Sequence, residues 1–63
     1  MNTTQILIEA DTVATRAHEA RRPVDRVHLF KVASALYMAA GKEEEAKLVD
    51  KLASIIAKRG EVR

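Results

Sequence analysis

Helix-breaking residues are rare in this chain, and their positions fix the lengths of the segments between them. Its 63 residues include one proline, Pro23, and two glycines, Gly41 and Gly60. Proline disfavours a helical conformation at the residue before it and suits the first turn of a new helix, whereas glycine commonly closes a helix. The three resulting stretches have helical length, and none shows the alternation of a β-strand. The sequence therefore predicts an all-α fold with three helices.

The first helix is expected over residues 3–21. Asn2 can cap it, and Gln5, three residues later, can complete a capping box. Its apolar stripe repeats at four-three spacing and consists of Ile6, Ala10, Val13, Ala17 and Ala20. Small side chains dominate this stripe and allow another helix to approach closely. Ile8 lies outside the stripe, so the sequence assigns it no cover.

The second helix is expected over residues 24–40 and is apolar in nearly every direction. Its core sequence, "LFKVASALYMAA", is interrupted only by Lys31 and Ser34. A helix that is apolar all round belongs in an interior. Two flanking helices of the same chain leave part of this circumference uncovered, and an apolar surface of that kind marks an interface.

The third helix is expected over residues 43–59. Acidic residues 43–45 open it and Lys58 and Arg59 close it, which matches the helix dipole. It carries two neighbouring apolar stripes, one of Ala46, Val49, Ala53 and Ile56 and one of Leu48, Leu52 and Ile55. Together they span roughly 200° of the circumference, more than one neighbouring helix can cover.

Chain length and the lack of cysteine point to oligomerisation. A chain this short usually needs disulfides, a metal or a partner subunit for stability, and it contains no cysteine. We therefore expect a three-helix bundle, or a helical hairpin plus an N-terminal helix, completed by homodimerisation. A homodimer is favoured over a complex with a different protein, because a patch left uncovered until that protein binds would aggregate. The expected interface residues are Leu29, Val32, Leu36, Met38 and Ala39, and which of them face inward is left open.

Residues 30–53, in the second and third helices, resemble the helical hairpin of a tetratricopeptide repeat. The resemblance is carried by Phe30, Ala33, Tyr37, Gly41, Ala46 and Ala53, at the repeat's large, small, aromatic, turn-glycine and two alanine positions. The sequence departs from the family at Asp50, where a bulky apolar residue is usual, and at Ser34, which replaces a common glycine. No closing proline follows, and residues 1–22 contain no second copy at the usual period of about 34 residues. The resemblance implies a protein-binding module without catalysis.

No residue pattern in the chain indicates chemistry. His18 and His28 are its only histidines and lack the spacing of paired metal ligands. The consecutive residues Glu43, Glu44 and Glu45 point about 100° apart on a helix, so they do not converge on one substrate. We therefore expect no catalytic residues, no cofactor, no metal and no enzymatic activity.

Four arginines surround the first turn between helices: Arg16, Arg21, Arg22 and Arg26. They could neutralise phosphates, although Glu19 and Asp25 dilute the cluster and no aromatic residue is interleaved with it. The net charge is +2. With no secretory signal and no apolar run long enough to span a bilayer, a cytoplasmic protein that does not contact membranes is expected.

Two functions follow as hypotheses. The first is a small helical protein–protein interaction module (an adaptor, inhibitor or assembly subunit) that acts as an oligomer. The alternative is a small nucleic-acid-binding regulator that uses the arginine-rich turn.

Overall fold

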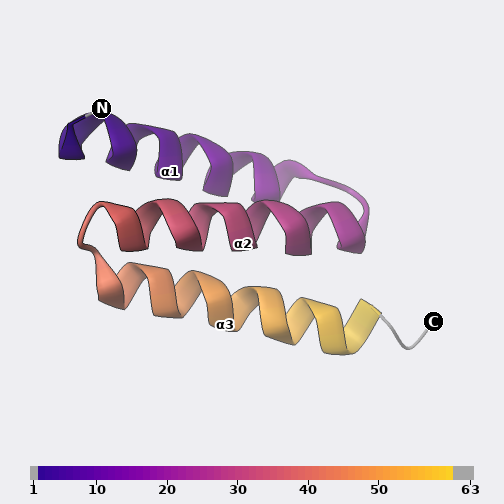
Figure 1. Ribbon diagram of the computed structural model, residues 1–63. Helices are drawn as coiled ribbons and strands as arrows, with labels where there is room; N and C mark the ends of the chain where they lie inside the picture. Colours follow the sequence, from indigo (N-terminus) through magenta and orange to yellow (C-terminus); the bar gives the residue numbers. More distant parts are fainter. Residues whose placement is uncertain (1, 61–63) are drawn as a thin grey trace.

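The chain folds into three helices in up–down–up order in a computed structural model, which describes residues 2–60 (Figure 1). The helices are α1 (Thr3–Glu19), α2 (Pro23–Ala39) and α3 (Glu43–Gly60). The all-α, three-helix fold predicted from the sequence is thus confirmed. α2 lies between the other two helices and packs extensively on both, whereas α1 and α3 make few contacts with each other.

The first turn reverses the chain in three residues. α1 begins where predicted, because the Asn2 side-chain oxygen accepts a hydrogen bond from the Gln5 backbone N–H at 2.9 Å. It ends at Glu19, two residues before the predicted end, since Ala20 already has extended backbone with ψ of 138°. Arg22 is also extended, as expected for a residue before proline. Residues 20–22 therefore form the connection.

The second turn depends on the backbone conformation of Gly41, whose φ is +80°. This left-handed conformation is costly for residues with a side chain. The Gly41 N–H donates to the Met38 carbonyl at 3.0 Å, and the Lys42 N–H donates to the Tyr37 carbonyl at 2.8 Å. Both bonds satisfy carbonyl groups at the end of α2 and close that helix. α3 then starts at Glu43.

Alanines and two aromatic rings build the core. The buried residues form two neighbouring clusters, one of Ala10, Ala33, Tyr37 and Ala46 and one of Ala17, Phe30 and Ala53. Each cluster joins all three helices. Phe30 is the largest fully buried side chain, with 1% of its surface exposed. The alanines let α2 approach both neighbours closely, but each buries little apolar area.

None of the helices in residues 2–60 combines the length and apolar character needed to cross a membrane. The circumference of α2, although apolar in sequence, is divided between a side that packs on its neighbours and a side that is exposed.

Candidate interaction surfaces

Large hydrophobic side chains are exposed on every helix of this small fold. The exposed set within the described residues is Ile8, Val24, Val32, Met38, Leu48, Leu52 and Ile55. Ile8 is the member on α1, as expected for a residue that lies outside its apolar stripe. The other six are on α2 and α3, where they form two surfaces.

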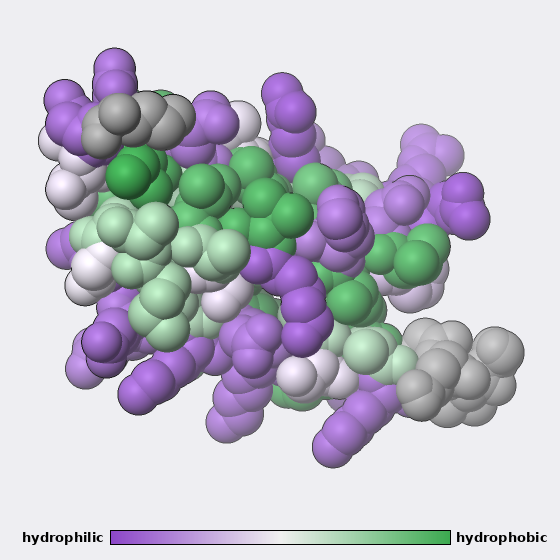
Figure 2. All heavy atoms as spheres, viewed as in Figure 1, coloured by the Kyte–Doolittle hydropathy of each residue, from purple (hydrophilic) through white to green (hydrophobic). Residues whose placement is uncertain are grey.

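The first surface is the outward face of α2, which we define as Val24, Val32, Ala35, Met38 and Ala39, all exposed. These positions lie on the side of α2 away from the buried residues of the two core clusters. Figure 2 shows hydrophobic surface running across α1 and α2 in this view, with hydrophilic side chains at its edges.

The five residues expected at an interface on the second helix fall into two groups. Val32, Met38 and Ala39 are exposed on the outward face of α2. Leu29 and Leu36 are half-buried and pack against the core clusters. The structure therefore separates these residues: three are accessible to a partner, and two already have neighbours within the chain.

The second surface is the α3 stripe, which we define as Leu48, Leu52 and Ile55. Their exposed fractions are 64%, 40% and 40%. The other apolar stripe of α3 faces the core, where Ala46 and Ala53 are buried. Both stripes were visible in the sequence, but the interface residues predicted from it were all on the second helix and did not include the α3 stripe. The four-three spacing of large aliphatic residues, beside a row of smaller ones, was the pattern that indicated this stripe.

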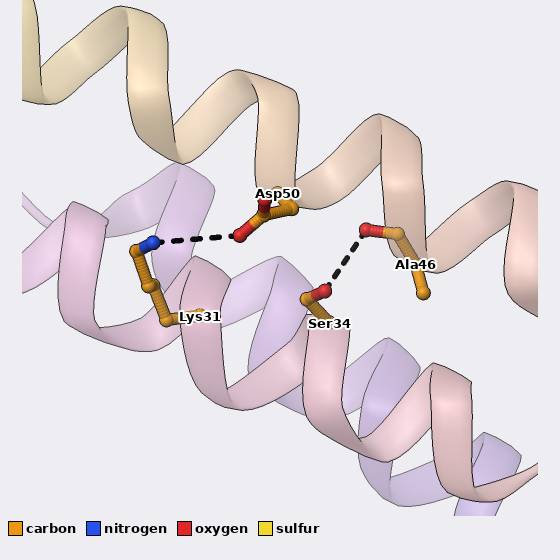
Figure 3. A network of polar contacts seen from close by, with 4 residues as sticks. All are labelled: Lys31, Ser34, Ala46 and Asp50. Atoms are coloured by element: carbon orange, nitrogen blue, oxygen red, sulfur yellow. Dashed lines mark hydrogen bonds and ion pairs between the residues drawn. The ribbon is translucent and has the colours of Figure 1, made fainter.

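Two polar contacts connect α2 to α3 (Figure 3). The Ser34 hydroxyl donates to the Ala46 carbonyl at 2.9 Å, in a partly buried position. Lys31 Nζ lies 3.5 Å from Asp50 Oδ1, and both side chains are more than half exposed. Asp50, where the tetratricopeptide repeat has a bulky apolar residue, is thus at the surface and faces Lys31. The partly buried Ser34 bond helps to fix the register of the α2–α3 hairpin, whereas solvent screens the exposed Lys31–Asp50 pair.

A third polar contact connects α1 to α2. The Tyr37 hydroxyl donates to Asp11 Oδ1 at 2.5 Å, in a partly buried position. This hydrogen bond is the main reason why the pKa of Tyr37 is raised to about 12, and burial and the negative charges of Asp11 and Glu45 act in the same direction. The tyrosine stays protonated at neutral pH, so its role here is to hold two helices together.

The two histidines lie in different surroundings. His18 is exposed, but its ring meets Phe30 edge-on, with ring centroids 5.1 Å apart. It therefore covers one side of the most buried aromatic ring. His28 is exposed on α2. Residues 2–60 contain no group of three side chains arranged to hold a metal ion.

Basic side chains gather at one end of the molecule. The C-terminal end of α3 lies at the same end as the α1–α2 turn, because α3 runs antiparallel to α2 (Figure 1). The basic residues there are Arg16, Arg21, Arg22, Arg26, Lys58 and Arg59. Arg26 is half-buried, and its Nε has no hydrogen-bond partner within the described residues. Sequence reasoning found four of these six, since the other two join them only through the antiparallel packing.

Five of the residues behind the tetratricopeptide resemblance lie in the core: Phe30, Ala33, Tyr37, Ala46 and Ala53 are all buried. No protein-family model matches this chain, and neither a curated protein nor a solved structure matches it. The resemblance stays a prediction from the sequence.

Proposed function

We propose that this chain is a non-catalytic helical module that works by binding another protein and that acts as an oligomer. The observation that carries the proposal is the distribution of apolar side chains. Within residues 2–60, the core consists mainly of alanine, while seven large hydrophobic side chains are exposed. Exposed apolar patches on small folds mark interaction sites. The tetratricopeptide resemblance supports the same kind of function.

The outward face of α2 is suited to contact a helix of a partner. Ala35 and Ala39 keep its centre shallow, so the backbone of a second helix can approach it. Met38, 51% exposed, has a flexible side chain that adapts to different apolar partners. Lys31 and Lys42 are exposed beside this face, but Asp25 is exposed next to Val24 and Asp50 lies 3.5 Å from Lys31, so the charges around the face are mixed. A partner of matching chemistry is an amphipathic helix that packs its apolar side on this face.

The test is site-specific photo-cross-linking with the full chain in its native host. A photoreactive residue at Ala35 should become linked to a partner protein, and the same residue at Lys47, an exposed position on α3, should not. Adding Met38→Glu should abolish the Ala35 adduct, because the glutamate would be desolvated in the apolar contact. An adduct that survives Met38→Glu, or equal labelling from both positions, would contradict a contact through this face.

Nucleic acid binding is the second candidate function. It is favoured by the six basic side chains, contributed by all three helices, at one end of the molecule. Phosphate contacts make affinity depend steeply on salt. Binding of generic duplex DNA and RNA should therefore be measured at about 50 and about 200 mM salt. The protein-binding proposal expects no binding at the lower salt concentration, whereas tight binding that is lost at the higher one would favour a nucleic-acid-binding regulator.

A further inference from the structure

We infer that the α3 stripe is the contact of a symmetric homodimer in which the two α3 helices pack antiparallel. Leu48, Leu52 and Ile55 follow one another at intervals of four and three residues, which is the spacing of the apolar seam in a coiled coil. All three remain exposed after the chain has folded. The stripe therefore offers about two helical turns of an apolar seam that lacks a second helix.

Charges at the ends of α3 identify the second helix as another copy of this chain. Glu44 and Glu45 lie in the first turn of α3, and Lys58 and Arg59 lie in its last turn. All four are exposed. In an antiparallel pair, the acidic end of each α3 lies beside the basic end of the other, so opposite charges meet at both ends of the seam. A parallel pair would bring like charges together at both ends, and this disfavours it.

The spacing of the seam also agrees with antiparallel symmetry. With Leu52 near the two-fold axis, Leu48 of one copy meets Ile55 of the other, so each layer contains two large aliphatic side chains. Lys51, which is exposed, lies close to its own counterpart across the axis. These two long side chains can extend into solvent, but their like charges weaken the contact. Replacing Lys51 with glutamine should therefore tighten the dimer.

The inference deepens the proposed function and rests on it, since both take exposed apolar side chains as contact surfaces. It assigns self-association to the α3 stripe and leaves the outward face of α2 available for a different protein. The two surfaces can be disrupted separately, because Leu52 is on α3 and Met38 is on α2.

Sedimentation of the full chain over a range of concentrations tests the inference. The wild-type chain should be a dimer at micromolar concentration. Leu52→Glu should be a folded monomer, because Leu52 is 40% exposed within its own chain and an exposed position tolerates a charge. Met38→Glu, the matched control on α2, should remain dimeric while losing the Ala35 photo-adduct. A monomeric wild type, a dimeric Leu52→Glu variant or a dimer lost in Met38→Glu would overturn the α3 contact. An adduct that persists in Met38→Glu would instead contradict only the proposed function.

Charge exchange gives a second test that does not depend on the apolar residues. The double variants Glu44→Lys/Glu45→Lys and Lys58→Glu/Arg59→Glu should each lose self-association. In each variant both ends of α3 carry the same charge, so two copies repel each other at both ends. Mixed together they should form a heterodimer, and all four changes in one chain should restore the homodimer. No rescue in either case would overturn the pairing of opposite ends.

Thiol cross-linking reports the relative orientation of the two α3 helices directly, because the natural chain contains no cysteine. A short bifunctional thiol reagent should link Lys51→Cys chains efficiently, since this position is close to the two-fold axis. It should not link Glu44→Cys chains, whose two copies lie roughly 20 Å apart along the helix axis at about 1.5 Å per residue. Efficient linking of Glu44→Cys would show a parallel pair and overturn the inference.

Discussion

The two apolar stripes of α3 differ in exposure. The side that packs on α2 buries Ala46 and Ala53 and half-buries Val49 and Ile56, while the α3 stripe leaves Leu48, Leu52 and Ile55 exposed. Small residues on the packed side allow close helix contact. The exposed side chains of the α3 stripe would contribute free energy, at roughly 25 cal/mol per Å² of buried apolar area, only when another chain covers them. In this molecule, close packing within the chain and a large exposed apolar surface lie on neighbouring sides of one helix.

The largest expected effect comes from removing Phe30, the largest fully buried side chain. Phe30→Ala should lower the free energy of unfolding by about 3–5 kcal/mol, because it leaves a cavity between three helices. A small domain is stabilised by little more than this, so the variant should keep only a small part of its free energy of unfolding. Urea unfolding followed by circular dichroism measures the loss. The matched control is Ile55→Ala on the α3 stripe, measured at a concentration low enough for monomers, where the change should stay within about 0.5 kcal/mol. Equal losses in the two variants would remove the contrast between core and stripe.

Replacing an alanine with a larger residue should also distinguish the buried core from an exposed helix face. Ala53→Leu adds three carbon atoms in a fully buried position beside Phe30, and overpacking should cost about 1–3 kcal/mol. Ala35→Leu makes the same change on the exposed outward face of α2 and should alter the free energy of unfolding by no more than about 0.5 kcal/mol. Thermal unfolding of both variants compares them. If Ala53→Leu is tolerated as well as Ala35→Leu, the alanine contacts do not control how close the helices lie.

Tyr37→Phe tests the partly buried polar contact between α1 and α2. At neutral pH it should cost about 1 kcal/mol, through loss of the hydrogen bond to Asp11. The pKa of Tyr37 is about 12 in the folded chain, above the ordinary value of 10.0. The folded state therefore holds this proton more tightly, and wild-type stability should fall as pH rises from about 10 to about 12. The phenylalanine variant should lack this component of the pH dependence. Because Tyr37 is the single tyrosine, its ultraviolet absorbance reports its titration directly, and a midpoint near 10 in the folded chain would contradict the contact.

The smallest expected effect is at the exposed pair of Lys31 and Asp50. Solvent screens this interaction, so a double-mutant cycle with Lys31→Gln and Asp50→Asn should give a coupling of no more than about 0.5 kcal/mol. Ser34→Ala, which removes the partly buried hydrogen bond on the same pair of helices, should cost about 1 kcal/mol. A coupling larger than the Ser34 effect would mean that the surface of the hairpin contributes more than its interior.

The helices could be predicted closely because their signals are local. Pro23 at the start of α2, the Asn2 cap and the left-handed Gly41 act within a few residues of their own positions. The faces of the helices could not be predicted as well. Leu29 and Leu36 look equivalent to Val32 and Met38 in an apolar sequence, and only the positions of α1 and α3 decide which pair is half-buried.

Contacts between residues that are distant in sequence could not be predicted from sequence patterns either. The gathering of Lys58 and Arg59 with the arginines of the first turn requires the antiparallel packing of α2 and α3. Likewise, the contact between Tyr37 and Asp11 joins residues 26 positions apart. In contrast, the two apolar stripes of α3 were visible in the sequence, and the structure decided which of them is covered.

A core built from alanine also affects how the molecule responds to temperature. The heat capacity of unfolding rises with the apolar area that unfolding exposes, and it averages about 12–15 cal/mol/K per residue. Alanine seams expose less of this area, so the monomer should lie below that average and have a flat stability curve, with little change between cold and warm conditions. If the α3 stripe is buried in a dimer, calorimetry should record a larger heat capacity change for the wild-type chain than for Leu52→Glu. The difference would measure the part of the apolar surface that a single chain leaves in contact with water.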